Sequence, residues 1–295
     1  MPRMQIATIL LIAGCWTGAR ADFSYKQTTK MTGGMMMKFA GMMSGARISE
    51  PNSSTVAVKG SKMANIGSIS GTIIDVEAQT ITTLDFDQKR YWVRTFDEIR
   101  KTMDEAFSQS GLKGSDLKVD VRDGGNTKTL LGRETHDKVF QVTMPIKDPR
   151  TGNQLDMKVS SDLYLATGIS GTDQLKEFHK KMSGIAWAPG GLPMLNRPEV
   201  AKATAEVMKA AGEMNGFPLM TVVSVHGTIP GMPDMSRFGG APAPASSKES
   251  ADDTLIEMTT EVTSTSTEEV QSSMFEIPAG FTKTDPPAAI GGRRR

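Results

Sequence analysis

GTIIDVEAQTITTLDFDQKRYWVRT, residues 71–95, is the stretch that decides the fold class. It contains three runs rich in β-branched and aromatic residues, at 71–76, 80–85 and 90–95, and such runs are typical of strands. Short polar pieces at 77–79 and 87–89 separate the runs. Spacing this regular, with connections this short, predicts an antiparallel meander.

Strand patterns continue on both sides of this meander. They cover 23–29, 54–60, 117–121, 127–131, 138–144, 157–166, 217–226 and 255–263, and a short closing element covers 275–278. Helical spacing of apolar residues predicts helices over 95–109, 173–182 and 198–214. Thr95 and Glu98 form a capping box at the start of the first helix, and Thr172 is the expected cap of the second. The predicted fold class is α+β, with more strand than helix.

The N-terminus has the pattern of an export signal. Arg3 supplies a positive charge, and the apolar run at 6–14 is too short to cross a bilayer as a helix. Ala19 and Ala21 provide the small side chains of a cleavage site. We therefore expect residues 1–21 to be a signal peptide, the mature chain to begin at Asp22, and the protein to be periplasmic or secreted.

A second interpretation of the N-terminus depends on Cys15. The sequence Ile-Ala-Gly-Cys at 12–15 resembles a bacterial lipobox, in which the cysteine is lipidated and the protein is anchored to a membrane surface. Trp16 directly after it favours ordinary secretion instead. Cys15 is the only cysteine of the chain. Cleavage after Ala21 would therefore leave no thiol for a disulfide, a nucleophile or a zinc site.

The composition is that of a nearly neutral, water-soluble chain. Lys plus Arg is 34 against 33 for Asp plus Glu, and no basic stripe of the kind that binds nucleic acid is visible. No run is long enough to predict a membrane span after residue 21. We expect a single domain over 22–283, a mobile Pro/Gly-rich loop at 229–252 and a disordered tail at 284–295.

Four fragments carry a resemblance to a known family. They are VKGSKM at 58–63, the stretch from IDV at 74 to RYW at 92, LGRET at 131–135 and SMFEIPAGF at 273–281. In order and spacing they resemble a family of uncharacterised secreted bacterial proteins, similar in fold to the LolA/LolB lipoprotein carriers. The resemblance implies a curved antiparallel sheet, an incomplete β-barrel, with helices packed in or over its concave face around an apolar cavity.

The function expected from this fold is non-catalytic binding of a lipid, an acyl chain or another apolar ligand. Sites of this kind are concave and mostly apolar, with few polar groups. Tyr91 and Trp92 are expected on opposite faces of one strand. The candidate lining residues are Met63, Ile74, Leu84, Trp92, Phe96, Ile99, Met103, Phe107, Phe140 and Tyr164.

Two other functions compete with ligand binding. The first is a structural or protein-interaction module of the cell envelope with a filled core. The second is copper binding by the methionines at 31, 35–37, 42 and 43, because thioethers are soft ligands that can select Cu(I). No histidine or cysteine lies near them, and methionine also suits an adaptable apolar surface.

No pattern of catalytic residues is visible in the sequence. GSISG at 67–71 has Ile69 where a nucleophile elbow needs serine, and GISGT at 168–172 lacks the lysine of a phosphate loop. His136, His179 and His226 show no metal-ligand spacing. We therefore expect no enzyme activity and no cofactor.

Overall fold

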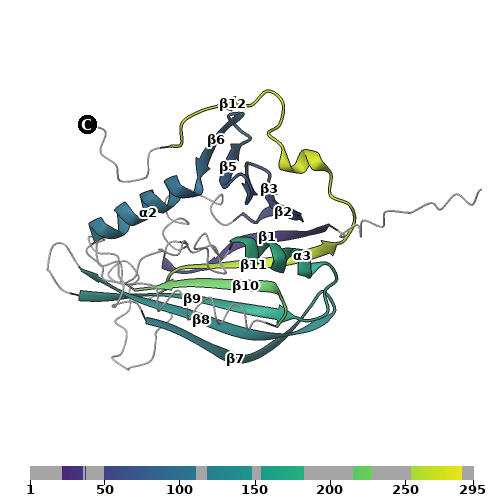
Figure 1. Ribbon diagram of the computed structural model, residues 1–295. Helices are drawn as coiled ribbons and strands as arrows, with labels where there is room; N and C mark the ends of the chain where they lie inside the picture. The colour runs from purple at the N-terminus through teal and green to yellow at the C-terminus, as the bar shows by residue number, and fades with distance from the viewer. Residues whose placement is uncertain are drawn as a thin grey trace, which may run out of the picture.

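The computed structural model describes residues 22–35, 37, 50–110, 118–147, 154–182, 215–227 and 254–287. The predicted helix at 198–214 and the predicted mobile loop at 229–252 lie outside these ranges, as does the predicted signal peptide. The described part of the chain forms one large curved, unclosed sheet, with α2 (Phe96–Ser110) and α3 (Thr172–Met182) as its α-helices (Figure 1).

The strands follow the predicted pattern closely. They are β1 (Phe23–Gly33), β2 (Asn52–Lys59), β3 (Lys62–Gly67), β4 (Ser70–Asp75), β5 (Thr80–Asp85), β6 (Arg90–Thr95), β7 (Lys118–Leu130), β8 (Arg133–Lys147), β9 (Gln154–Ala166), β10 (Phe217–His226), β11 (Thr254–Ser266) and β12 (Thr282–Lys283). Their order across the sheet is β12-β6-β5-β4-β3-β2-β1-β11-β10-β9-β8-β7. Neighbours are antiparallel except β12 and β6, which are parallel. Two meanders, β2–β6 and β7–β11, are thus joined through β1.

The turns of the first meander form for a local reason. Asp75 and Asp85 each accept, through Oδ1, the backbone N–H three residues later, at 2.9 and 3.0 Å. The last residue of each turn, Gln79 or Lys89, has a positive φ of 54° or 48°. This repeated turn confirms the meander predicted from residues 71–95.

One face of the sheet carries both helices, and we call it the helix-bearing face. Phe178 of α3 packs in one buried cluster with Phe23 and Val58 of the sheet, and Phe96 at the start of α2 belongs to the same cluster. Phe23, Val58 and Phe178 have no exposed surface. This first cluster is therefore a closed core between the sheet and its helices.

The helix starts show one confirmed prediction and one wrong one. At α2 the N–H of Thr95 donates to Glu98 Oε2 at 2.8 Å and the N–H of Glu98 donates to Thr95 Oγ1 at 3.2 Å, which is the predicted capping box. Thr172 is instead the first residue of α3, and its hydroxyl donates backwards to the carbonyl of Ile169 at 2.9 Å. The turn before it needs Gly171, whose φ is 84° and whose Cα lies against Phe23.

The opposite face of β2–β6 is covered by a C-terminal strap, residues 267–283. The strap includes a 3₁₀ helix, η6 (Ser272–Phe275), where the sequence predicts a short closing element slightly later. Val270 and Phe275 of the strap are buried in a second cluster with Leu84 of the sheet. Phe281 packs edge-on against Phe86, with ring centroids 5.7 Å apart.

Three strand predictions need correction. Residues 62–67 form β3, which the sequence analysis leaves out, and β12 is a further strand at the sheet edge. The two strands predicted at 117–121 and 127–131 are one strand, β7 (Lys118–Leu130), which is irregular between Asp123 and Thr127. Asp137 on β8 holds this irregular stretch, because its carboxylate accepts the backbone N–H of Asn126 at 2.7 Å and the Asn126 amide at 2.8 Å.

Candidate functional site

An apolar floor covers the helix-bearing face of the second meander. It consists of two neighbouring rows of side chains that run across the strands. Each member of the first row lies opposite the next one on the neighbouring strand, from β1 through β11, β10, β9 and β8 to β7. The members, in that order, are Met31, Met258, Val223, Ser161, Phe140 and Val121. In the second row Ile256, Val225, Val159, Val142 and Val119 do the same from β11 to β7. Ser161 is the one polar member.

The strand register places this floor on the same face as α3. Directly paired residues share a face of a sheet, and residues two apart along a strand also share it. Phe23 and Tyr25 on β1 pack in or against the first cluster, and Met31 follows them at even spacing. The pairing of Met31 with Met258 then carries the same face across to β7.

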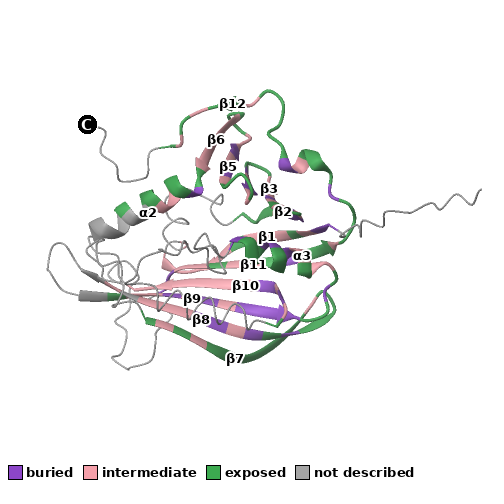
Figure 2. Cartoon of the chain, viewed as in Figure 1, coloured by how far each residue is buried: buried purple, intermediate pink, exposed green. Residues whose placement is uncertain are grey.

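The floor is less closed than the first cluster. Met258 is 39% exposed, and most of the other side chains are half-buried, whereas Phe140 and Val159 are buried. In Figure 2 the buried parts of the long strands gather near α3, and half-buried parts continue away from it. The apolar surface thus extends beyond the area that α3 covers.

A polar row separates the floor from the first cluster. Thr29, Thr260 and Thr221 lie opposite one another on β1, β11 and β10, and the first two hydroxyls are 2.8 Å apart. Across β9 the row continues through Leu163 to Lys138 on β8. The row ends at Asp123 on β7, opposite Lys138, so the described border of the floor has hydroxyl groups, a cation and a carboxylate.

Tyr25 packs against the first cluster, four residues before Thr29 of the polar row on the same face of β1. Its ring packs against Phe23 and Phe217, at centroid distances of 5.8 and 5.2 Å. Burial raises the pKa of Tyr25 to about 12, so its hydroxyl stays protonated and can act as a hydrogen-bond donor.

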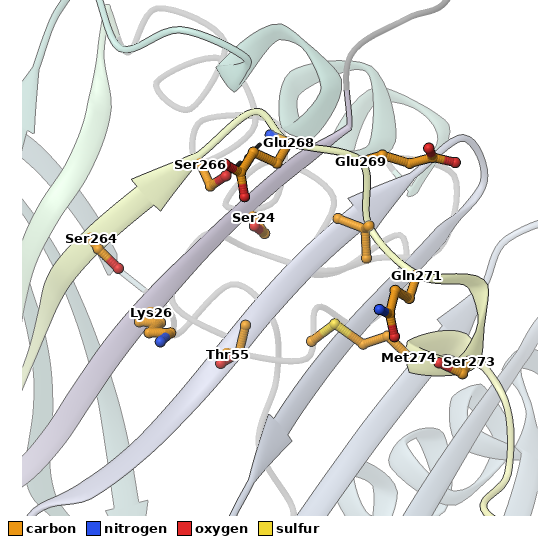
Figure 3. Close-up of a pocket in the computed structure, with 11 residues that line it drawn as sticks. Ser24, Lys26, Thr55, Ser264, Ser266, Glu268, Glu269, Gln271, Ser273 and Met274 are labelled. Atoms are coloured by element: carbon orange, nitrogen blue, oxygen red, sulfur yellow. Dashed lines mark hydrogen bonds between the residues drawn. The ribbon is translucent and has the colours of Figure 1, made fainter.

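A polar groove of about 630 Å³ lies on the other face, between the sheet and the strap (Figure 3). Ser24, Lys26, Thr55, Ser264 and Ser266 line it from β1, β2 and β11, and Glu268, Glu269, Val270, Gln271, Ser273 and Met274 line it from the strap. Most of these side chains carry a hydroxyl group or a charge, and Val270 and Met274 add apolar surface.

An ionic latch fixes the strap at one end of the groove. The Asp22 carboxylate accepts the backbone N–H of Val270 at 2.8 Å and lies 3.0 Å from the Lys59 ammonium. Lys59 also donates to the Val270 carbonyl at 2.9 Å. Because Asp22 is 9% exposed, these bonds form largely out of water. The latch joins the start of β1 to the C-terminal strap.

The predicted lining residues do not form one site. Met63, Ile74, Phe96 and Ile99 belong to or pack against the first cluster. Phe140 belongs to a third cluster with Leu163 and Leu165, at the apolar floor. The side chains of Met103 and Phe107 lie outside the described residues.

The other three predicted residues differ in face or burial. Leu84 is buried in the second cluster, beneath the strap. Tyr164 is on the face opposite to Leu163, with the Lys128 ammonium 4.4 Å from its ring centroid. Trp92 is half-buried on the helix-bearing face, and its neighbour Tyr91 packs against the second cluster, so their predicted opposite orientation is confirmed.

Most of the floor was missed by the sequence analysis. Alternation is the one sequence pattern that indicates these residues. Val119 and Val121 on β7 alternate with charged residues, and Val223 and Val225 on β10 are two residues apart, so each pair shares a face of its strand. Met31 was noted only as part of the methionine-rich segment. Met36, Met42 and Met43 of that segment lie outside the described residues, so the copper hypothesis stays a prediction.

Within the described ranges no three His, Cys, Asp or Glu side chains gather in a way that could hold a metal ion. In the same ranges no helix combines the length and the apolar character needed to cross a membrane.

The fold places the described chain among proteins built on a large, curved, unclosed antiparallel sheet. No protein-family model matches the sequence, and no curated protein matches it.

Proposed function

We propose that the protein is an exported envelope protein that binds a lipid or another long apolar ligand, without catalysis, on the apolar floor. The observation that carries this proposal is the pair of neighbouring aliphatic rows on the helix-bearing face, together with the 39% exposure of Met258. A group of neighbouring apolar side chains that stays partly exposed is typical of a binding surface.

The energy available at such a floor is sufficient for binding. If a ligand covered about 200 Å² of apolar surface, the transfer out of water would contribute about 5 kcal/mol. The entropy that the ligand loses on binding opposes this gain. The floor itself loses little entropy, because a hydrogen-bonded sheet already holds its side chains in place. A gain of about 5 kcal/mol corresponds to a dissociation constant of about 0.2 mM, so we expect affinity in the submillimolar range or weaker.

The resemblance to lipoprotein carriers supports the same proposal. In that arrangement the helix-bearing face is the concave side of an incomplete barrel, and α2 and α3 lie inside it. The topology agrees, because the connection from β6 to β7 passes between opposite edge regions of the sheet and begins with α2. A long ligand would then lie between the helices and the floor.

The N-terminal pattern supports export. β1 begins at Phe23, one residue after the predicted first residue of the mature chain. Removal of residues 1–21 would leave every described strand intact. The lipobox interpretation remains the alternative, and the mass of the processed N-terminus distinguishes the two.

A fluorescent probe tests the binding proposal. N-phenyl-1-naphthylamine is uncharged and brightens in apolar surroundings, and hexadecanol can compete with it. We expect the full chain to bind the probe and Val225→Asn on the floor to weaken binding about tenfold, because the amide adds a polar group there. Val222→Asn is the matched control, since Val222 lies on the other face of β10 between Thr259 and Asp162.

The outcome separates the proposal from its competitor. A folded wild-type chain that takes up neither the probe nor hexadecanol contradicts ligand binding. That result favours the interaction module with a filled core, and the closed first cluster would be part of that core. Equal effects of the two valine substitutions would place the binding site away from the floor.

A further inference from the structure

Among the described residues, Lys138 is the cation that the strand register places at the border of the apolar floor. It stands on β8 two residues before Phe140, on the same face, and directly opposite Leu163 on β9. Phe140 and Leu163 are 8% and 4% exposed. The Lys138 side chain is only 24% exposed, so its methylene stem lies among apolar neighbours while its ammonium group reaches the border of the floor.

The acidic partner of Lys138 is weakly placed. Asp123 on β7 lies opposite Lys138, and its Oδ1 is 3.8 Å from the Lys138 ammonium. The Asp123 side chain is 89% exposed. An ion pair this long, with one partner in water, contributes little and opens easily. Lys138 can therefore accept another anion.

The hydroxyl groups of the polar row lie on the same border. Thr221 is opposite Leu163, which is itself opposite Lys138. His136, also on this face of β8, is exposed and lies on the side of Lys138 away from Phe140. An anionic head group at Lys138 would thus meet water on the His136 side, while the Thr221 hydroxyl lies two strands, about 10 Å, away on β10.

The floor has the dimensions of a long alkyl chain. Neighbouring strands are about 4.8 Å apart, and two residues along a strand span about 6.7 Å. The path from Lys138 on β8 to Ile256 on β11 crosses three strand steps and two rows. It is therefore about 20 Å long.

We propose that the ligand is an anionic amphiphile, whose carboxylate or phosphate pairs with Lys138 while its alkyl chain lies over the two rows of the floor. This inference rests on the proposed function and names the chemical class of its ligand. A carboxylate or phosphate oxygen near a partly desolvated ammonium forms a charge-assisted hydrogen bond, which is stronger than one between neutral groups.

Three amphiphiles with the same chain test the head group. The assay measures how well each amphiphile displaces the neutral probe from the full chain at about pH 8, where a carboxylic acid is ionised. The three amphiphiles are hexadecanoate, hexadecyl phosphate and hexadecanol. We expect both anions to bind about five- to tenfold more tightly than hexadecanol. The comparison between the two anions shows which of them is the better model of the natural head group.

Two variants test the residue. Lys138→Met keeps the apolar stem and should remove the preference for the anions while leaving hexadecanol binding within about twofold. Asp123→Asn removes the competing carboxylate and should strengthen binding of the anions about two- to threefold. Lys30→Met is the control, because Lys30 is exposed and its side chain is on the opposite face of β1 from Met31.

The results separate the two proposals. If hexadecanol and the anions bind wild type equally, or if Lys138→Met keeps the preference, the head-group inference is wrong and apolar binding on the floor still stands. If none of the three amphiphiles binds the folded chain, the proposed function fails with it. A preference lost equally in Lys30→Met would show a general charge effect and would overturn the role of Lys138.

Discussion

The latch between Asp22 and the C-terminal strap gives a quantitative prediction. Asp22→Ala removes the carboxylate that accepts the Val270 N–H at 2.8 Å and that lies 3.0 Å from the Lys59 ammonium. Without this acceptor the Val270 N–H is buried and unpaired, which should lower the free energy of unfolding by about 1–3 kcal/mol. Lys59 is 34% exposed and keeps its bond to the Val270 carbonyl, so the loss of its ion pair with Asp22 adds little to this cost.

The free energy of unfolding should therefore fall by about 1–3 kcal/mol in Asp22→Ala, as measured by urea denaturation. Hydrogen exchange should show the loss first in the strap, residues 267–283, because the latch holds that segment. Glu269→Ala is the matched control. Glu269 also faces Lys59, at 3.5 Å, but its side chain is 89% exposed, so we expect a change below about 0.5 kcal/mol.

Two results would refute this reasoning. One is an unfolding free energy of Asp22→Ala within about 0.5 kcal/mol of wild type, which would mean that water satisfies the Val270 N–H. The other is an equal loss in Glu269→Ala, which would mean that net charge around Lys59 matters and the buried bond does not.

Two further predictions concern turns. Leu131 has a φ of 49° and is 47% exposed in the two-residue turn before β8. Asparagine tolerates this backbone conformation better than leucine, so Leu131→Asn should raise the unfolding free energy by about 0.5–1 kcal/mol in urea denaturation. An unfolding free energy below that of wild type would contradict the backbone strain at Leu131. The N–H of Gln88, together with the Arg90 guanidinium, holds the pKa of Asp85 below its usual range. The stabilisation from Asp85 is therefore present above about pH 4 and is lost as the pH falls through the folded-state value, so Asp85→Asn should show a flatter decline of stability in acid titrations. An unchanged slope would contradict it.

Local signals in the sequence predicted local structure well. The meander of residues 71–95 and the capping box of Thr95 and Glu98 are confirmed, because neighbouring residues decide both. The failures also have local causes. Gly124, Gly125 and Asn126 look like a turn, yet Asp137 on the next strand holds them within β7.

The candidate site was harder to predict because it depends on long-range register. Met31 meets Met258 across the sheet, and no pattern within either strand indicates that pairing. Alternation shows that Leu84 and Phe140 each have an inward side, but it does not say which face of the sheet that side belongs to. The structure puts Leu84 beneath the strap and Phe140 on the floor.

The central position of β1 has a consequence for how the chain reaches this fold. β1 pairs with β2, which follows it closely, and with β11, which begins more than two hundred residues later. Contacts of such high contact order form slowly. During synthesis the first meander can assemble by itself, but the two halves of the sheet cannot join until Thr254–Ser266 has been made. If the protein is exported as we propose, a chain that stays open until residue 254 has been made can still be threaded through a translocation channel before its sheet closes.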